Sequence, residues 1–185
     1  MINTTSHQPS GRKYALTAGQ IRQALYWPFT HRYTAAGWLA LRLYLGWVWL
    51  QFSISKFQSG WLTSDPIGML FTSIAKGSLP VPLPFYRDIA ATLLSLGVSP
   101  LISHIMPFLE LAVGLAFLSG VLVTPAAVGA ILLNTNIILS GVGILAFDGR
   151  IIVLQMLLIM ARRVAGQIGL ERLLVRSIPH LKPIK

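Results

Sequence analysis

Glu110 is an acidic residue in an otherwise apolar stretch of the chain. It lies within the run from Ile105 to Leu118, where a buried helix would ordinarily carry leucine. It is one of only five acidic residues in the chain. An isolated charge costs several kcal/mol in hydrocarbon, so this carboxyl group must be neutral, paired or hydrated. Because ionisable residues in apolar segments commonly mark functional sites, we take Glu110 as the candidate catalytic residue.

The other apolar segments also carry polar side chains at a comparable depth. With a helical rise of about 1.5 Å per residue, these side chains and Glu110 lie roughly 15–22 Å from the inner ends of their segments. This pattern fits a polar pocket that binds a ligand headgroup, or a hydrogen-bonded layer that only holds helices together. The predicted pocket residues are Gln51, Trp49, Asn134, Asn136 and Gln155.

Several cations are candidate ligands for a small anionic substrate. Arg42, Trp49 and Lys56 are spaced by seven residues and therefore share one helix face. Lys56 lies at the outer end of this helix, where it would form a basic vestibule together with other cations of the connecting segments. The alternative is a set of solvated rim residues, with Arg42 extending to the inner surface and Asp148 pairing with Arg150. The predicted substrate-binding residues are Lys56, Arg42, Arg87 and Arg150, with Lys76 nearby.

The composition is typical of an integral membrane protein. The 185 residues are 54% hydrophobic and only 11% charged, and the mean hydropathy is +0.67. Soluble domains carry about a quarter charged residues. Four apolar segments are each close to the roughly 20 residues that cross a bilayer. They are Ala35–Ser55, Ile102–Leu122, Pro125–Gly143 and Ile144–Ala161.

The net charge of +10 points to lipid headgroups and not to nucleic acid. Of the 15 lysines and arginines, four precede the first apolar segment and six follow the last, so ten flank the two chain ends. The positive-inside rule then predicts that both termini are cytoplasmic. We therefore expect a multi-pass protein of a prokaryotic inner membrane that interacts with membrane lipids and binds no nucleic acid.

The predicted fold is all-α, an up-down four-helix bundle with short amphipathic helices in the outer loop and at both ends. Residues 1–34 form a cytoplasmic tail, in which Thr17 and Gln20 have capping-box spacing and Pro28 ends a short helix. Residues 35–165 form the transmembrane domain, and residues 166–185 form a second interfacial tail. Within the outer loop 56–101, Asp65-Pro66 starts one helix and Gly77 ends it, and Phe85–Leu96 forms another.

The residue types present also limit the cofactors. Cysteine is absent, which excludes thiolate chemistry and Cys-held metal centres within this chain. His31 and His104 lie at opposite ends of the predicted bundle and cannot ligate one haem iron. We therefore predict no haem and no metal site.

Four sequence blocks resemble the DoxX/DoxD family, which contains the membrane subunit of thiosulfate:quinone oxidoreductase. The resemblance extends from about Gly37 to Leu174, and the block beginning at Ala161 is its most specific part. The blocks are Leu41–Gln51 with Lys56, Glu110–Gly114, Asn134–Asn136 with Ser140-Gly141, and Ala161–Gly166 with Gly169–Arg172.

The resemblance implies a membrane oxidoreductase subunit that uses quinone as a substrate. Two thiosulfates would be oxidised to tetrathionate and the electrons passed to quinone. Two alternatives stay open, namely a non-catalytic accessory subunit of a larger respiratory complex and a quinone- or lipid-binding protein without turnover. The oxidoreductase and the accessory-subunit hypotheses both include a partner, which is a second protein subunit or another copy of this chain in a homo-oligomer.

Overall fold

The computed structural model describes residues 17–165, and this part of the chain is helical and contains no strand. The all-α prediction is therefore confirmed. The predicted interfacial helix in 166–185 lies outside the described residues. The elements in chain order are α1 (Ala18–Thr30), η1 (Arg32–Thr34), α2 (Ala35–Gln58), α3 (Pro66–Ala75), α4 (Phe85–Ser95), α5 (Ser99–Ser119), α6 (Val123–Leu139), α7 (Leu145–Met160) and α8 (Arg162–Ala165).

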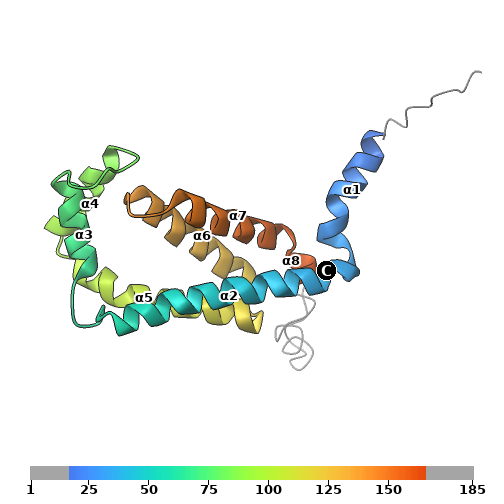
Figure 1. Ribbon diagram of the computed structural model, residues 1–185, viewed down its shortest axis with the longest axis horizontal. Helices are drawn as coiled ribbons and strands as arrows, with labels where there is room; N and C mark the ends of the chain where they lie inside the picture. The colour runs from blue at the N-terminus through green and yellow to red at the C-terminus, as the bar shows by residue number, and fades with distance from the viewer. Residues whose placement is uncertain (1–16, 166–185) are drawn as a thin grey trace, which may run out of the picture.

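The body of the molecule is built from α2, α5, α6 and α7 (Figure 1). The most extensive helix contact joins α2 to α5, and α6 and α7 form a second closely packed pair. Gly46 meets Gly114, and further along α2 Ser53 meets Pro107, so α2 and α5 run antiparallel. A Cβ atom on Gly114 would lie 3.0 Å from the backbone nitrogen of Leu50, which explains the need for glycine at this crossing.

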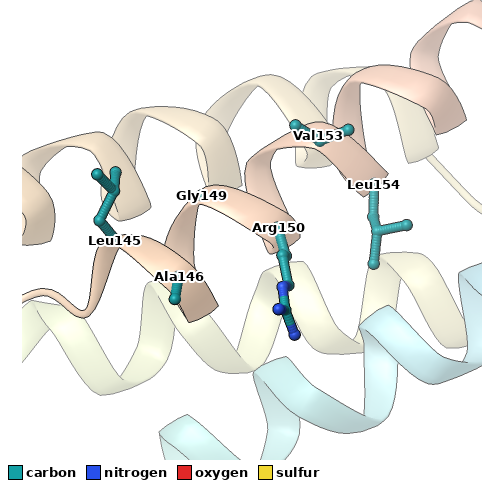
Figure 2. Close-up of a pocket in the computed structure, with 6 residues that line it drawn as sticks. All are labelled: Leu145, Ala146, Gly149, Arg150, Val153 and Leu154. Carbon is teal, nitrogen blue, oxygen red and sulfur yellow. The ribbon is translucent and has the colours of Figure 1, made fainter.

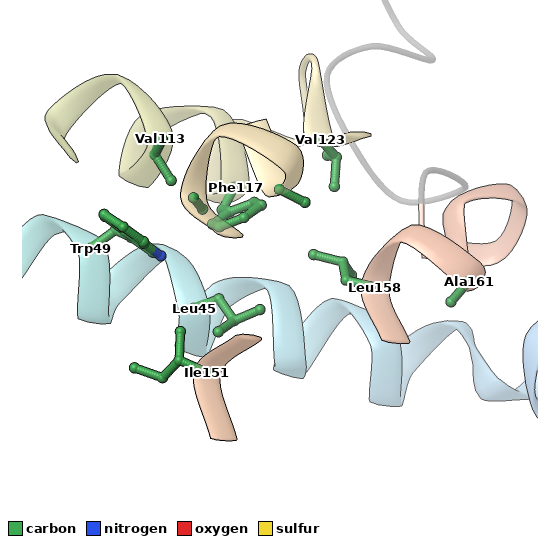
Figure 3. Close-up of a cluster of buried hydrophobic side chains, with 10 residues drawn as sticks. Leu45, Trp49, Val113, Phe117, Val123, Ile151, Leu158 and Ala161 are labelled. Carbon is green, nitrogen blue, oxygen red and sulfur yellow. The ribbon is translucent and has the colours of Figure 1, made fainter. Parts of the chain in front are cut away.

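The core between these helices is apolar and continuous. In Figure 3, Leu45 and Trp49 reach from α2 toward Phe117 and Val113 of α5. Buried residues of α6 and α7, including Ile151, complete the same cluster. Spacings of three and four residues along each helix produce these buried stripes, as expected for amphipathic packing.

One helix of the described part of the chain, α5, is long and apolar enough to cross a membrane by length and composition. α6 is also apolar but has 17 residues, and α7 has 16. The structure thus gives partial support for membrane association. Four membrane spans and the positions of the termini stay predictions.

The helices predicted in the long loop are present and form a cap at one end of the bundle (Figure 1). Asp65 is the N-cap of α3, its carboxylate accepting from the Gly68 N–H at 2.8 Å, and Pro66 occupies the first helical position. α3 ends one residue before Lys76, and Gly77 then adopts φ of +74°. Tyr86 and Ala90 of α4 pack with α3 in a second hydrophobic cluster.

The first helix is longer than the sequence predicts. Pro28 was expected to end it, but α1 continues to Thr30 with Pro28 inside. The carbonyl of Pro28 accepts hydrogen bonds from Thr34 Oγ1 and Trp38 Nε1, both at 2.7 Å. These bonds fix the corner between α1 and α2, so the end of α1 is set by contacts with α2 and not by the proline.

Candidate functional site

The site is centred on an ion pair between Lys56 and Glu110. Lys56 Nζ lies 2.8 Å from both carboxylate oxygens of Glu110. The Glu110 side chain is 1% exposed and the Lys56 side chain 18%. The ammonium also lies over the Trp61 ring, 5.0 Å from its centroid, and 5.8 Å from that of Phe52. Glu110 thus faces the interior as predicted, and its charge is paired with a cation of α2.

This pairing changes the role expected for Lys56. The sequence predicts that Lys56 is a free cation at an outer vestibule, but in the structure its charge is neutralised by Glu110. A bidentate, largely buried pair has little net field beyond its immediate surroundings. One turn earlier, Ser53 Oγ donates to the carbonyl of Pro107 at 2.8 Å and joins the same two helices. This bond holds the ion pair in a fixed register.

Two amides lie in the bundle interior without hydrogen bonds. Asn134 and Gln155 are both 0% exposed. Neither amide has a partner for its oxygen or its nitrogen within residues 17–165, and the same is true of Trp49 Nε1. Leaving a buried polar group unsatisfied costs about 1–3 kcal/mol, so native interiors normally supply a partner. The three side chains therefore present unused donors and acceptors to a bound molecule or to ordered water.

The helices place these groups on the faces that form the core. Asn134 follows Ala127 and Ala130 along the buried stripe of α6. Gln155 lies between Ile151 and Leu158 on α7, and both of these belong to the core cluster that contains Trp49. The unpaired groups therefore come from three helices that surround one core.

Two of the predicted pocket residues lie elsewhere. Gln51 is on the exposed face of α2. Asn136 is exposed, and its Oδ1 accepts a hydrogen bond from the Tyr86 hydroxyl at 2.7 Å. This bond connects the cap to the end of α6. Burial raises the pKa of Tyr86, and the bond to Asn136 offsets part of that effect.

Arg42 is 2% exposed and lies against the end of α5. A Cβ atom built on Gly120, the C-cap of α5, would be 2.5 Å from Arg42 Nη1. A cation at a helix C-terminus interacts favourably with the helix dipole and the terminal carbonyls. Arg42 therefore turns toward α5 and does not extend to the surface, which is a structural role that the sequence did not indicate.

The remaining cations of the predicted vestibule are exposed. Lys76 and Arg87 lie on the cap. Arg150 borders an open groove of about 610 Å³ on α7, whose other walls are apolar (Figure 2). Asp148 does not pair with Arg150, because its carboxylate accepts from the backbone N–H of Ile144 at 2.7 Å. The groove is lined by Leu145, Ala146, Gly149, Arg150, Val153 and Leu154.

Asp65 is the centre of a polar network under the cap. The sequence predicted that Asp65 starts α3, but it did not predict the other hydrogen bonds of this network. The Asp65 carboxylate accepts from Ser99 Oγ and Ser103 Oγ, both at 2.7 Å, and Ser103 Oγ accepts from the Ile67 N–H. Burial alone would raise the pKa of Asp65, but the hydrogen bonds from Ser103, Ser99 and Gly68 lower it overall. The only available signal was the four-residue spacing of the two serines on one helix face.

The two histidines within residues 17–165 lie at opposite ends of the bundle. His31 stacks with Trp27 and Tyr33 beside the start of α2. His104 contacts the carbonyls of Pro100 and Leu62 near the cap. Within the described ranges, no group of three histidine or carboxylate side chains is placed to hold a metal ion.

The best-supported site is thus the Lys56–Glu110 pair together with the buried, unpaired groups of Trp49, Asn134 and Gln155. Comparison with known proteins adds no relative to this description. No family model matches the chain, and no curated protein or solved structure is detectably similar to it.

Proposed function

We propose that this chain is a multi-pass membrane protein that binds a quinone in its bundle core, as the membrane subunit of a quinone-linked oxidoreductase. The composition and the apolar helix α5 support the membrane location. The positions of the two cations of α2 also support a membrane location. Lys56 pairs with Glu110, and Arg42 lies against the end of α5, so neither cation faces the surrounding lipid.

The observation that carries the proposal is the set of buried, unpaired groups on Trp49, Asn134 and Gln155. An indole N–H can only donate, and each amide nitrogen also donates, so these three nitrogens call for acceptors, while the two amide oxygens call for donors. The ring of an oxidised quinone is flat and apolar and carries two carbonyl acceptors. An apolar core with a few polar groups is the usual setting for such a ligand.

Reduction of a quinone consumes two electrons and two protons. Glu110 is a buried acidic group of the bundle, and Lys56 is bound to it as a proton-carrying partner. We infer that this pair exchanges the protons that accompany reduction. Thiosulfate oxidation to tetrathionate releases two electrons for every two thiosulfates, which balances one quinone. Since Lys56 is neutralised by Glu110, the site favours the quinone half of this reaction over recognition of the dianion.

Two measurements test the proposal on the chain purified into lipid nanodiscs. The first is the dissociation constant of a short-chain quinone, and the second is thiosulfate-dependent quinone reduction. Asn134→Leu and Gln155→Met keep the volume but remove the donors, and each should raise the dissociation constant about 5–10-fold. Thr135→Val is the matched control, because Thr135 is the exposed neighbour of Asn134 on α6.

Each outcome has a definite meaning. Glu110→Gln should suppress quinone reduction while quinone still binds. Binding without thiosulfate-dependent reduction would assign the electron-donating step to another subunit. If the wild type binds no quinone, and the two core variants change only thermal stability, then the amides form a structural layer and the quinone proposal is wrong.

A further inference from the structure

α2 presents an exposed face that carries an amide in its second half. The exposed residues recur at alternating intervals of three and four over three heptads. Gln51 lies among them, and its side chain has no hydrogen-bond partner within residues 17–165. The residues of this α2 seam are Gly37, Ala40, Tyr44, Trp47, Gln51, Ile54 and Gln58.

The composition of the α2 seam differs from that of a face in contact with lipid alone. The exposed face of α5 carries large apolar side chains such as Leu101, Phe108 and Leu109. The α2 seam also carries the large residues Tyr44, Trp47 and Ile54, but it combines them with two glutamines and two small residues. A Cβ atom on Gly37 would meet nothing within 4 Å. Gln51 lies seven residues before the end of α2, roughly 10 Å along the axis. With α2 in the membrane, as in the proposed function, an amide at that position would gain hydrogen bonds only from another protein helix.

We propose that the α2 seam binds the α2 seam of a second copy of this chain in a parallel, two-fold symmetric dimer. The inference rests on the membrane location in the proposed function. A glutamine amide both donates and accepts, so two Gln51 side chains related by a two-fold axis satisfy each other. Gly37 and Ala40 allow close approach of the backbones at the other end of the seam.

The geometry selects a parallel pairing. Identical copies inserted with the same topology place Gln51 opposite Gln51 at one level of the membrane. The repeat of seven residues keeps the seam in register along the helix, as in left-handed helix pairs. An antiparallel pairing would instead set Gln51 against the first half of α2, where the seam offers Gly37, Ala40 and Tyr44 and no amide.

The dimer leaves the proposed quinone site intact. Arg42, Trp49 and Lys56 also recur every seven residues, but they lie on the opposite face of α2 and are buried or partly buried against α5 and α7. Each copy therefore keeps its own ion pair and its own core. The seam joins two complete sites and does not complete either of them.

The absence of cysteine makes this inference directly testable. Single cysteines are introduced as Trp47→Cys, Ile54→Cys and, as a control on the exposed face of α5, Leu109→Cys. Leu109 is 46% exposed and Ile54 41%. Membranes that contain each variant are oxidised with copper phenanthroline, and the dimer fraction is read on a denaturing gel. The two seam variants should cross-link in the majority of molecules and Leu109→Cys only at background.

A second measurement addresses the role of the amide itself. Gln51→Leu should lower the dimer association constant about tenfold, measured by energy transfer on dilution with lipid, and Gln51→Asn should restore part of it. Equal cross-linking at Leu109→Cys, no cross-linking at the seam, or an unchanged constant in Gln51→Leu would overturn the proposal. Quinone binding is measured on the same proteins, so that the quinone hypothesis and the dimer hypothesis can fail separately. If the wild type binds no quinone but the seam variants still cross-link, the quinone hypothesis is wrong and the dimer is supported.

Discussion

Removing the two partners of the Lys56–Glu110 pair should have unequal effects on stability. Lys56→Met leaves a carboxylate that is 1% exposed, and breaking a buried pair in this way costs about 3–5 kcal/mol. Glu110→Gln leaves an ammonium that is 18% exposed, can reach water and still finds an amide oxygen as acceptor. We expect a cost of about 1–2 kcal/mol for Glu110→Gln. The double variant Lys56→Met/Glu110→Leu should lie close to wild type, since apolar replacement of a whole buried pair is often neutral.

Thermal unfolding of the purified protein in one detergent measures this asymmetry. For a chain of this size, 1 kcal/mol corresponds to about 2–4 °C in Tm, so Lys56→Met should lower Tm by about 6–20 °C. Glu110→Gln should lower it by about 2–8 °C. The reasoning is refuted if Lys56→Met is as mild as Glu110→Gln, or if the double variant is as unstable as the sum of the two single ones.

Three other predictions concern packing and the cap. Gly114→Ala should cost about 1–3 kcal/mol because the new Cβ would meet the facing α2 backbone, whereas Gly129→Ala, which meets nothing within 4 Å, should gain about 0.5–1 kcal/mol; thermal melts compare them. Asp65 has a folded-state pKa below its unfolded value, so its hydrogen bonds stabilise the fold above about pH 4 and this contribution is lost as the pH falls further. The melting temperature of Asp65→Asn should accordingly decline less than that of wild type between pH 7 and pH 3, and an equal decline would contradict the role of Asp65. Tyr86→Phe should cost about 0.5–1.5 kcal/mol through its bond to Asn136, and faster hydrogen exchange in α4 than in α5 would locate the loss at the cap.

Local signals in the sequence were sufficient to locate the helices of the outer loop. Asp65-Pro66 predicted the start of α3 because the cap and the proline act within a single turn. The prediction that Pro28 ends the first helix was wrong because a distant contact outweighed the local signal. A proline disfavours helix continuation, but the bonds from Thr34 and Trp38 to its carbonyl hold the corner beyond it, and such bonds depend on the tertiary structure.

The sequence predicted the burial of Glu110 and Gln155 but not the exposure of Gln51. Glu110 and Gln155 lie in the interior as expected. Gln51 lies on the same helix as Lys56 but about 140° around α2 from it, since each residue adds about 100°. Depth estimates alone therefore cannot distinguish the core face from the exposed face. The pairing of Lys56 with Glu110 was also missed, because the two residues are 54 positions apart and only the antiparallel packing of α2 and α5 brings them together.

This separation has a consequence for how the protein is made. The ribosome adds about 5–20 residues per second, so Lys56 is synthesised roughly 3–10 s before Glu110. The interval between the synthesis of Arg42 and that of Gly120, which it contacts at the end of α5, is longer still. During that interval α2 carries two cations without their final surroundings, so it cannot settle in its final place as an independent helix. Chains truncated before α5 should therefore be favoured substrates of quality-control proteases.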